Sequence, residues 1–260
     1  MASYHLLSFV FSILLFIFIS PSLSFNNAAA APVKSQNVKV SLYYESLCPY
    51  CANFIENQLV KVFNTDLITI VNLRLVPYGN TQTIGPDKTI ICQHGDKECY
   101  LNTIHACAIK AWPDEKMHFK LIQCIEGEAS QSEQAEAAWR KCCDVLRFSE
   151  EPIDTCYESG EGRKLILKYA NETDGLKPPH RFVPWVTVND LALAEDFQNF
   201  IAYVCKAYKG KDLPNACRSR WQLQRSTVKE TSVLRVCYEG EPRESKAFAA
   251  AKKVPKSLET

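Results

Sequence analysis

Two cysteines separated by two residues, Cys48 and Cys51, constrain this 260-residue chain more than any other feature. Such a pair can close into a small disulfide ring and open again, or it can supply half of a zinc site. Residues 38–44, before the pair, alternate apolar and more polar side chains with the period of a strand. Residues 52–63, after it, space their apolar side chains like a helix. The pair is therefore predicted where a strand ends and a helix begins.

This junction predicts different roles for the two cysteines. Pro49 suits the first helical position, where a missing N–H costs nothing, and this places Cys48 at the N-cap beside free backbone N–H groups. A thiolate is stabilised there, so we expect the pKa of Cys48 to lie at or below roughly 6, against about 8.5 for a free cysteine. Cys51 lies further inside and is expected to remain a thiol until it attacks. One cysteine is thus predicted to attack and the other to resolve.

Zinc binding and a permanently closed bridge are the alternatives for the pair. A structural zinc site needs four ligands, usually from two such pairs, and the chain has no second Cys-x-x-Cys motif. We therefore expect no metal. A closed and inert Cys48–Cys51 bridge would instead make the chain a secreted, disulfide-rich binding protein. The strand-to-helix setting favours redox chemistry.

Charge and cysteine content restrict the partners and the compartment. The formal net charge of +1 gives no electrostatic reason to expect nucleic acid or an anionic membrane as a partner. Residues 6–19 form an almost unbroken apolar run, too short for a comfortable membrane span and typical of a signal peptide, here assigned to residues 1–25. An uncleaved signal anchor is the alternative. With the signal removed, we expect no membrane association, a place in the secretory pathway, and disulfides among the twelve cysteines.

Asn171 begins the sequon Asn-Glu-Thr and is the predicted glycosylation site. In a secreted chain, a sequon of this kind is expected on a surface loop.

The order of predicted elements indicates an α/β fold. Residues 67–77 read as a second strand, so the first helix joins two parallel strands in a βαβ unit, and a Cys-x-x-Cys pair in such a unit is the thioredoxin-like cue. A tight turn at Asn189 and Asp190 is expected between two later strands. The other predicted elements are helices at 98–112, 117–125, 130–143, 157–171 and 197–208, and strands at 185–188 and 191–193.

These elements predict a thioredoxin-like fold interrupted by a disulfide-stapled helical insertion. The predicted parts are a signal peptide at 1–25, the first half of the fold at 36–80, the insertion at 81–156, the second half at 157–208, a disulfide-pinned arm at 209–238 and a flexible tail at 239–260.

Three stretches of the chain together resemble the gamma-interferon-inducible lysosomal thiol reductase family. They are Cys48-Pro49-Tyr50-Cys51, the run C-Q-H-G-D-K-E-C-Y-L-N at 92–102, and Pro178-Pro179-His180 leading into residues 183–189. The resemblance covers about residues 38–237. It implies a thioredoxin-like fold with a helical insertion and a reductase of protein disulfides in an acidic lumen.

The resemblance also implies site residues. Cys48 is then the nucleophile and Cys51 the resolving thiol, while Val183 and Pro184 match a cis-proline loop that positions an extended substrate segment. The run at 92–102 is expected to be structural, with His94 as a proton shuttle the alternative, and His105 and His180 are expected to be structural or surface residues. Two departures from the family pattern are the doubled cysteine at 142–143 and the length of the tail.

The remaining cysteines are candidates for structural disulfides, and their pairing cannot be read from the sequence. Proximity favours Cys92–Cys99 and Cys205–Cys217, whereas a bridge between the adjacent Cys142 and Cys143 would be strained. A spare thiol would allow a disulfide-linked homodimer. The candidates are Cys92, Cys99, Cys107, Cys124, Cys142, Cys143, Cys156, Cys205, Cys217 and Cys237.

The sequence thus predicts a thiol–disulfide oxidoreductase that acts on disulfide-bonded proteins, outside the cell or in a lysosomal or vacuolar lumen. A small-molecule thiol would re-reduce it, and no other cofactor is expected. A luminal disulfide oxidase or isomerase would use the same residues, and the secreted binding protein remains the alternative from another class.

Overall fold

A four-stranded sheet with the strand order β2-β1-β6-β7 organises the part of the chain that the computed structural model describes, residues 37–129, 135–218 and 235–239. β1 (Val38–Tyr44) runs parallel to β2 (Val71–Pro77), and β6 (Trp185–Val188) runs antiparallel to both β1 and β7 (Leu191–Ala192). A parallel βαβ unit extended by an antiparallel hairpin is the thioredoxin-like arrangement. The predicted fold class is confirmed.

The connection between β1 and β2 differs from the prediction in where its helix ends and where the second strand begins. Its helix α2 (Pro49–Asn57) is followed by a short 3₁₀ helix, η1 (Leu59–Val62), rather than continuing to residue 63. The predicted second strand begins late, at Val71, because η2 (Asp66–Thr69) takes up its first residues. The side chain of Thr65 accepts a hydrogen bond from the backbone N–H of Leu67 and so caps that turn.

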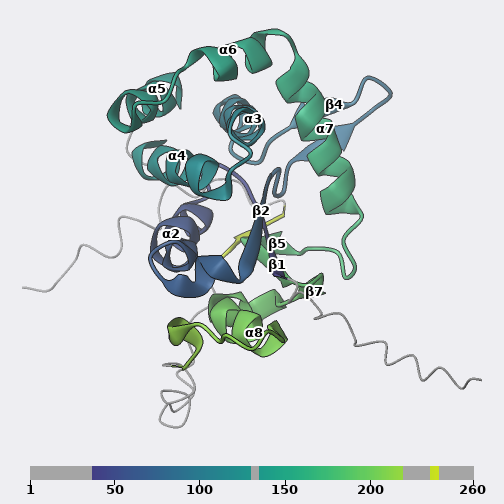
Figure 1. Ribbon diagram of the computed structural model, residues 1–260. Coiled ribbons are helices and arrows are strands. Elements are labelled where there is room, and N and C mark those ends of the chain that lie inside the picture. Colours follow the sequence, from purple (N-terminus) through teal and green to yellow (C-terminus); the bar gives the residue numbers. More distant parts are fainter. Residues whose placement is uncertain (1–36, 130–134, 219–234, 240–260) are drawn as a thin grey trace, which may run out of the picture. The chain divides into compact units, whose positions relative to one another are not determined.

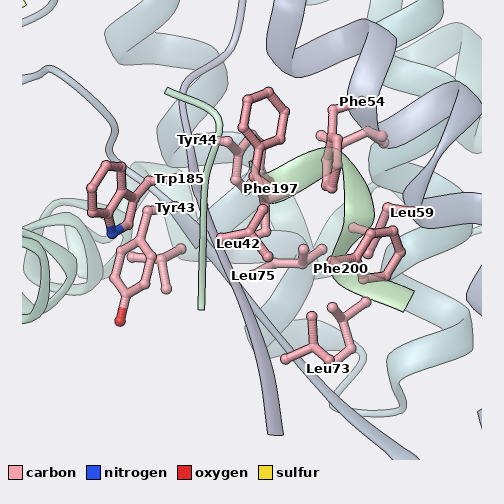
Figure 2. Close-up of a cluster of buried hydrophobic side chains, with 14 of the residues drawn as sticks. Leu42, Tyr43, Tyr44, Phe54, Leu59, Leu73, Leu75, Trp185, Phe197 and Phe200 are labelled. Carbon is pink, nitrogen blue, oxygen red and sulfur yellow. The ribbon is translucent and has the colours of Figure 1, made fainter. Parts of the chain in front are cut away.

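Aromatic side chains fill the core on both faces of the sheet. Leu42 and Tyr44 point from β1 toward Phe54, while their neighbour Tyr43 lies on the opposite face (Figure 2). Phe54 meets Phe197 and Phe200 edge to face, with ring centroids 5.5 and 5.6 Å apart. The helix that begins at the cysteine pair is therefore anchored against the last helix of the fold.

After β2, the described residues form a hairpin that the sequence did not reveal and then five helices, of which the first four begin within the predicted insertion at 81–156 and the fifth lies beyond it. The hairpin pairs β3 (Gln82–Ile84) with β4 (Thr89–Ile91), and its strands are too short to leave a readable alternation. The helices are α3 (Asp96–Ala111), α4 (Glu115–Ala129), α5 (Ala135–Leu146), α6 (Glu151–Glu158) and α7 (Glu161–Asp174). Figure 1 shows α3 to α6 grouped on one side of β1 and β2, with α8 on the other.

These helices build a second hydrophobic core, separate from that of the sheet. Leu101, Ile104, Leu121 and Trp139 are buried in it. The bridges Cys107–Cys156 and Cys124–Cys142 fasten its helices to one another. Burial and disulfides both hold this region together, as expected of a small helical insertion.

The single helix predicted at 157–171 is wrong, because the chain breaks between α6 and α7. Gly160 has φ 73°, a left-handed conformation that ends one helix and admits the next. α7 continues to Asp174, so the predicted glycosylation site lies in its last turn. Asn171 is exposed but helical rather than on a loop, and Thr173 is buried. The start predicted for the helix at 130 lies outside the described residues.

The last part of the fold closes the sheet much as predicted. Asn189 and Asp190, both with positive φ, form the expected turn between β6 and β7. Residues 197–199 belong to a 3₁₀ helix rather than to the closing helix. The remaining elements are β5 (Phe182–Val183), η3 (Ala194–Asn199), α8 (Phe200–Ala207) and β8 (Cys237–Tyr238).

Several predictions lie outside the described residues, among them the signal peptide at 1–25 and the tail from residue 240 onward. The proposed domain boundaries stay predictions. In the part of the chain that the structure describes, no helix has both the length and the apolar character needed to span a membrane.

Candidate active site

Cys48 lies where the sequence predicts it, between the end of β1 and the start of α2. It is the N-cap residue of α2, with extended backbone angles, and Pro49 occupies the first turn. Among the described residues, no side chain caps the start of this helix by a hydrogen bond. The sulfur of Cys48 is thus carried on the residue that faces the free N–H groups of the helix, the setting that stabilises a thiolate.

Cys48 is bonded to Cys237, and Cys51 is a free thiol. The inert Cys48–Cys51 bridge is therefore not formed in this structure, and Cys237, expected among the structural cysteines, joins the predicted nucleophile instead. Cys48 and Cys51 are both fully buried. In this bridged form, the sulfur of Cys48 is therefore not exposed to a substrate.

Cys237 reaches Cys48 along the predicted substrate-positioning strand. The bond between Val183 and Pro184 is cis, as expected. β8 pairs antiparallel with β5, Val183 opposite Cys237 and Phe182 opposite Tyr238. An extended, cysteine-bearing segment of this chain thus occupies the edge that the sequence analysis assigned to substrate.

A buried carboxyl group, that of Glu45, lies beside this bridge. Its Oε2 accepts a hydrogen bond of 2.7 Å from the backbone N–H of Asn80, while its Oε1 has no hydrogen-bond partner in the described part of the chain. Burial raises the pKa of Glu45 well above its ordinary value, and the neighbouring charge of Glu98 raises it further. A carboxylate oxygen of Glu45, a ring nitrogen of His94 and the sulfur of Cys237 lie within 4.8 Å of one another.

These three groups are of the kinds that bind metals, but they do not indicate a metal site. The sulfur of Cys237 is in a disulfide, and only a thiolate is an effective metal ligand.

Cys51, the predicted resolving cysteine, is a buried free thiol. Burial raises its pKa well above the ordinary value, and the charge of Glu45 adds to this, while a hydrogen bond with the backbone of Glu45 acts in the opposite direction. Cys51 therefore keeps its proton, as predicted. The low pKa expected for Cys48 stays a prediction, because a disulfide does not titrate.

Residues 92–102 form hydrogen bonds both to the segment before Cys48 and to the segment that carries Cys237. Nδ1 of His94 lies 2.7 Å from Oε2 of Glu98, and the other Glu98 oxygen accepts from Asn102. Asn102 in turn accepts a hydrogen bond of 2.9 Å from the backbone N–H of Ser46, two residues before Cys48. Nε2 of Gln93 donates to the carbonyl of Tyr238, 2.6 Å away. The structural role expected of this run thus includes positioning the residues around Cys48.

Glu45 and Asn80 are the residues of this site that the sequence analysis did not identify. Asn80 donates from its side chain to the carbonyl of Cys237 at 3.0 Å and from its backbone to Glu45. The available signal was the place of Glu45, a charged residue directly after a buried strand and three positions before Cys48.

His105, expected to be a structural or surface residue, lies in the interior beside Tyr44. It is fully buried, its Nδ1 lies 3.1 Å from the hydroxyl of Tyr44, and burial lowers its pKa to about 3. His180 is partly buried, and burial lowers its pKa as well.

The other disulfides settle most of the pairing left open. Cys92–Cys99 and Cys205–Cys217 are confirmed, and Cys142 pairs with Cys124 rather than with Cys143. Cys143 and Cys51 are the two free thiols among the described residues, and both are buried. A disulfide-linked homodimer would need a thiol at the surface, so it stays a prediction.

Comparison with known proteins identifies the family. The family model described as "Gamma interferon inducible lysosomal thiol reductase (GILT)" matches residues 39–146. The Arabidopsis thaliana "Gamma-interferon-responsive lysosomal thiol protein" is 42% identical over 209 residues, which cover 79% of this chain and 85% of the relative. The chain belongs to the GILT family. A mouse GILT protein is 37% identical over 189 residues, 71% of this chain and 73% of the relative.

These matches confirm the predicted family and, with it, the prediction that the protein is a thiol reductase.

Solved structures are similar to this chain at lower sequence identity. Chlamydia trachomatis DsbA has a TM-score of 0.48 at 12% identity, with 68% of this chain and 88% of that chain covered. Oxidised BdbD from Bacillus subtilis also has a TM-score of 0.48, at 13% identity, with 66% and 88% covered. The five disulfides of the described residues fit a protein of the secretory pathway or lysosome.

Proposed function

We propose that this protein reduces disulfides in other proteins by thiol–disulfide exchange at Cys48 and Cys51. The observation that carries the proposal is the bond from Cys48 to a cysteine outside the pair, Cys237, while Cys51 remains a free thiol one helical turn away. This is the arrangement of a mixed disulfide awaiting resolution. Cys237 stands in for the cysteine of a substrate, presented on an extended strand beside Pro184.

The reaction has two exchange steps. The Cys48 thiolate attacks one sulfur of the substrate disulfide, forms a mixed disulfide and displaces the other substrate sulfur, which takes up a proton. Cys51 then loses its proton and attacks the sulfur of Cys48, and the second substrate sulfur leaves as a thiol. The pair ends as a Cys48–Cys51 disulfide. Two molecules of a low-molecular-weight thiol re-reduce it and are themselves joined as a disulfide, so no other cofactor is needed.

An acidic lumen is the proposed place of action. The N-cap position of Cys48 supports it, because a thiolate stabilised by a helix end stays ionised at a pH that protonates ordinary thiols. The family name and the names of vertebrate relatives include the word lysosomal. We therefore propose a lysosomal or vacuolar lumen, with glycosylation at the exposed Asn171 and removal of the signal peptide on the way.

Reduction of insulin by a small thiol tests the proposal, at about pH 4.5 and about pH 7. Cys48→Ser is expected to abolish the protein-dependent rate, and Cys51→Ser to accumulate a mixed disulfide with insulin. Cys143→Ser, which removes the other buried thiol, is the matched control and is expected to retain the full rate. Equal rates for the parent protein and Cys48→Ser would refute the assignment. A redox titration of the pair separates a reductase from an oxidase or isomerase.

A further inference from the structure

The sulfur of Cys237 marks where a departing substrate sulfur lies. It is bonded to Cys48, so the groups around it are those that a substrate sulfur meets when Cys51 displaces it. A Glu45 carboxylate oxygen and a His94 ring nitrogen both lie within 4.8 Å of it. That separation is within reach of a proton transfer through one water or after a small movement, as catalytic contacts commonly tighten during reaction.

The carboxyl of Glu45 is held in place with one oxygen unoccupied. Oε2 is fixed by the backbone N–H of Asn80, and Oε1, fully enclosed, has no hydrogen-bond partner among the residues that the structure describes. His94 approaches Oε1 only to 3.7 Å, and its Nδ1 is paired more closely with Glu98. Burial keeps Glu45 protonated over a wider pH range than an exposed glutamate. An enclosed acid with a free oxygen is a suitable proton donor.

Glu45 is also close to the thiol that starts the resolving step. When Glu45 is ionised, its charge acts on that thiol more strongly than any other charge does. Glu98 and Glu126 act on Cys51 more weakly. One residue therefore neighbours both the sulfur that loses a proton and the sulfur that gains one.

We propose that Glu45 gives its proton to the departing sulfur when Cys51 resolves the mixed disulfide, and recovers the proton that Cys51 loses. This inference rests on the proposed function. The bond between Cys48 and the substrate sulfur breaks, and the bond between Cys48 and Cys51 forms. One thiol is consumed and one is released, so no proton or electron is gained or lost overall.

The test measures how fast Cys51 releases a thiol from Cys48 in a single turnover. A Cys237→Ser background opens Cys48, which is then loaded with either glutathione, an alkyl thiol, or thionitrobenzoate, an aromatic thiol that leaves readily without a proton. Glu45→Gln keeps the acceptor for Asn80 but cannot transfer a proton. We expect it to slow glutathione release by roughly 10²-fold, and to slow thionitrobenzoate release much less.

Glu126→Gln is the matched control, since Glu126 is a buried carboxyl whose charge also acts on Cys51. It is expected to leave both release rates near those of the background. An equal loss for both leaving groups in Glu45→Gln, or the same loss in Glu126→Gln, would overturn the role of Glu45. In the Cys237→Ser background with Glu45 intact, glutathione release is expected to be slower in deuterated water. The absence of an isotope effect would also overturn the role of Glu45. If Cys51 releases neither thiol in the background protein, the proposed function fails as well.

A second inference rests on a different observation, the pairing of β8 with β5. Two hydrogen bonds beyond the strand pairing hold β8 there: Asn80 donates to the carbonyl of Cys237, and Gln93 donates to that of Tyr238. With β8 in place, Cys48 is fully buried and the β5 edge is occupied. A protein substrate can therefore reach neither of the two features that would bind it.

The geometry points to residues 235–239 as a covalent cap that keeps the enzyme latent until the Cys48–Cys237 bridge is opened, by Cys51 or by an external thiol, and the sulfurs are reduced. Two molecules of a low-molecular-weight thiol convert the Cys48–Cys237 bridge into two thiols and become one disulfide. The cap can then leave β5, and the Cys48 thiolate is free to attack.

Insulin reduction started from the non-reduced protein tests the cap. At a low concentration of the small thiol, we expect a lag with the parent protein and none with Cys237→Ser, while both reach the same rate after full pre-reduction. Cys143→Ser is the control and is expected to keep the lag. Equal lags in the parent and Cys237→Ser, followed by normal rates, would overturn the cap alone. If neither protein is active after pre-reduction, the proposed function falls with it.

Discussion

Gly79 lies so close to Glu45 that a side chain does not fit between them. A Cβ atom at Gly79 would lie 2.5 Å from Oε2 of Glu45 and 2.6 Å from its Cβ, and the glycine has φ 59°. The backbone from Gly79 to Asn80 is therefore pressed against the carboxyl that it also binds. Glycine at this position allows Glu45 to be fixed by a main-chain N–H.

Gly79→Ala is expected to destabilise the protein and to displace the Glu45 carboxyl. A left-handed alanine costs roughly 1–2 kcal/mol, and the contact with Glu45 adds to this. Gly85→Ala is the matched control, because Gly85 has φ 70° but, apart from its neighbours in the chain, none of the described residues lies within 4 Å of its Cβ position. Urea unfolding of both variants checks the prediction. Equal losses of unfolding free energy would show that Gly79 is not packed against Glu45.

Glu126→Gln is expected to change how stability depends on pH. Burial raises the pKa of Glu126 well above its ordinary value. The folded state therefore binds more protons than the unfolded state above about pH 4.5, and stability is lost as the pH rises, by up to about 1.4 kcal/mol per pH unit. The glutamine variant lacks this loss.

Urea unfolding of the disulfide-intact parent and Glu126→Gln, across the range from acidic to neutral pH, measures the difference. His105 works in the opposite direction, because its pKa of about 3 makes stability fall as the pH drops below its unfolded value. Nδ1 of His105 lies 3.7 Å from Oε1 of Glu126, so the comparison reports the loss of the Glu126 carboxyl together with its effect on His105. Parallel stability curves for the two proteins would contradict the prediction.

Cys143 is expected to be inert. It is fully buried, and burial together with the charge of Glu150 raises its pKa to about 11. Iodoacetamide should therefore label neither Cys143 nor Cys51 in the folded, non-reduced protein, whereas both should react in denaturant. Mass spectrometry of peptides shows which sulfurs carry the label. Rapid labelling of Cys143 in the folded protein would contradict its burial. It would also show an accessible thiol that could form a disulfide-linked homodimer.

The site could be predicted from sequence where local rules determine the structure. The alternation of β1, the position of Pro49 and the turn at Asn189 and Asp190 are set by neighbours in the chain, and the structure follows them. The break at Gly160 was missed because apolar spacing continues across it, and a glycine within such a pattern signals a break only weakly.

The partner of Cys48 could not be predicted, because it depends on where the chain returns. Cys237 is 189 positions away, and sequence spacing says nothing about a bridge of that separation. Glu45 was missed for a related reason. Its burial follows from packing against Gly79 and Asn80, which lie after the second strand of the sheet.

The alkylation rate of Cys48 as a function of pH, after mild reduction of the protein, tests the central claim most directly. The N-cap position of Cys48 predicts a thiolate that reacts in acid, with the rate rising through a midpoint at or below roughly pH 6. A midpoint near about 8.5, the value of an ordinary thiol, would contradict the proposed mechanism.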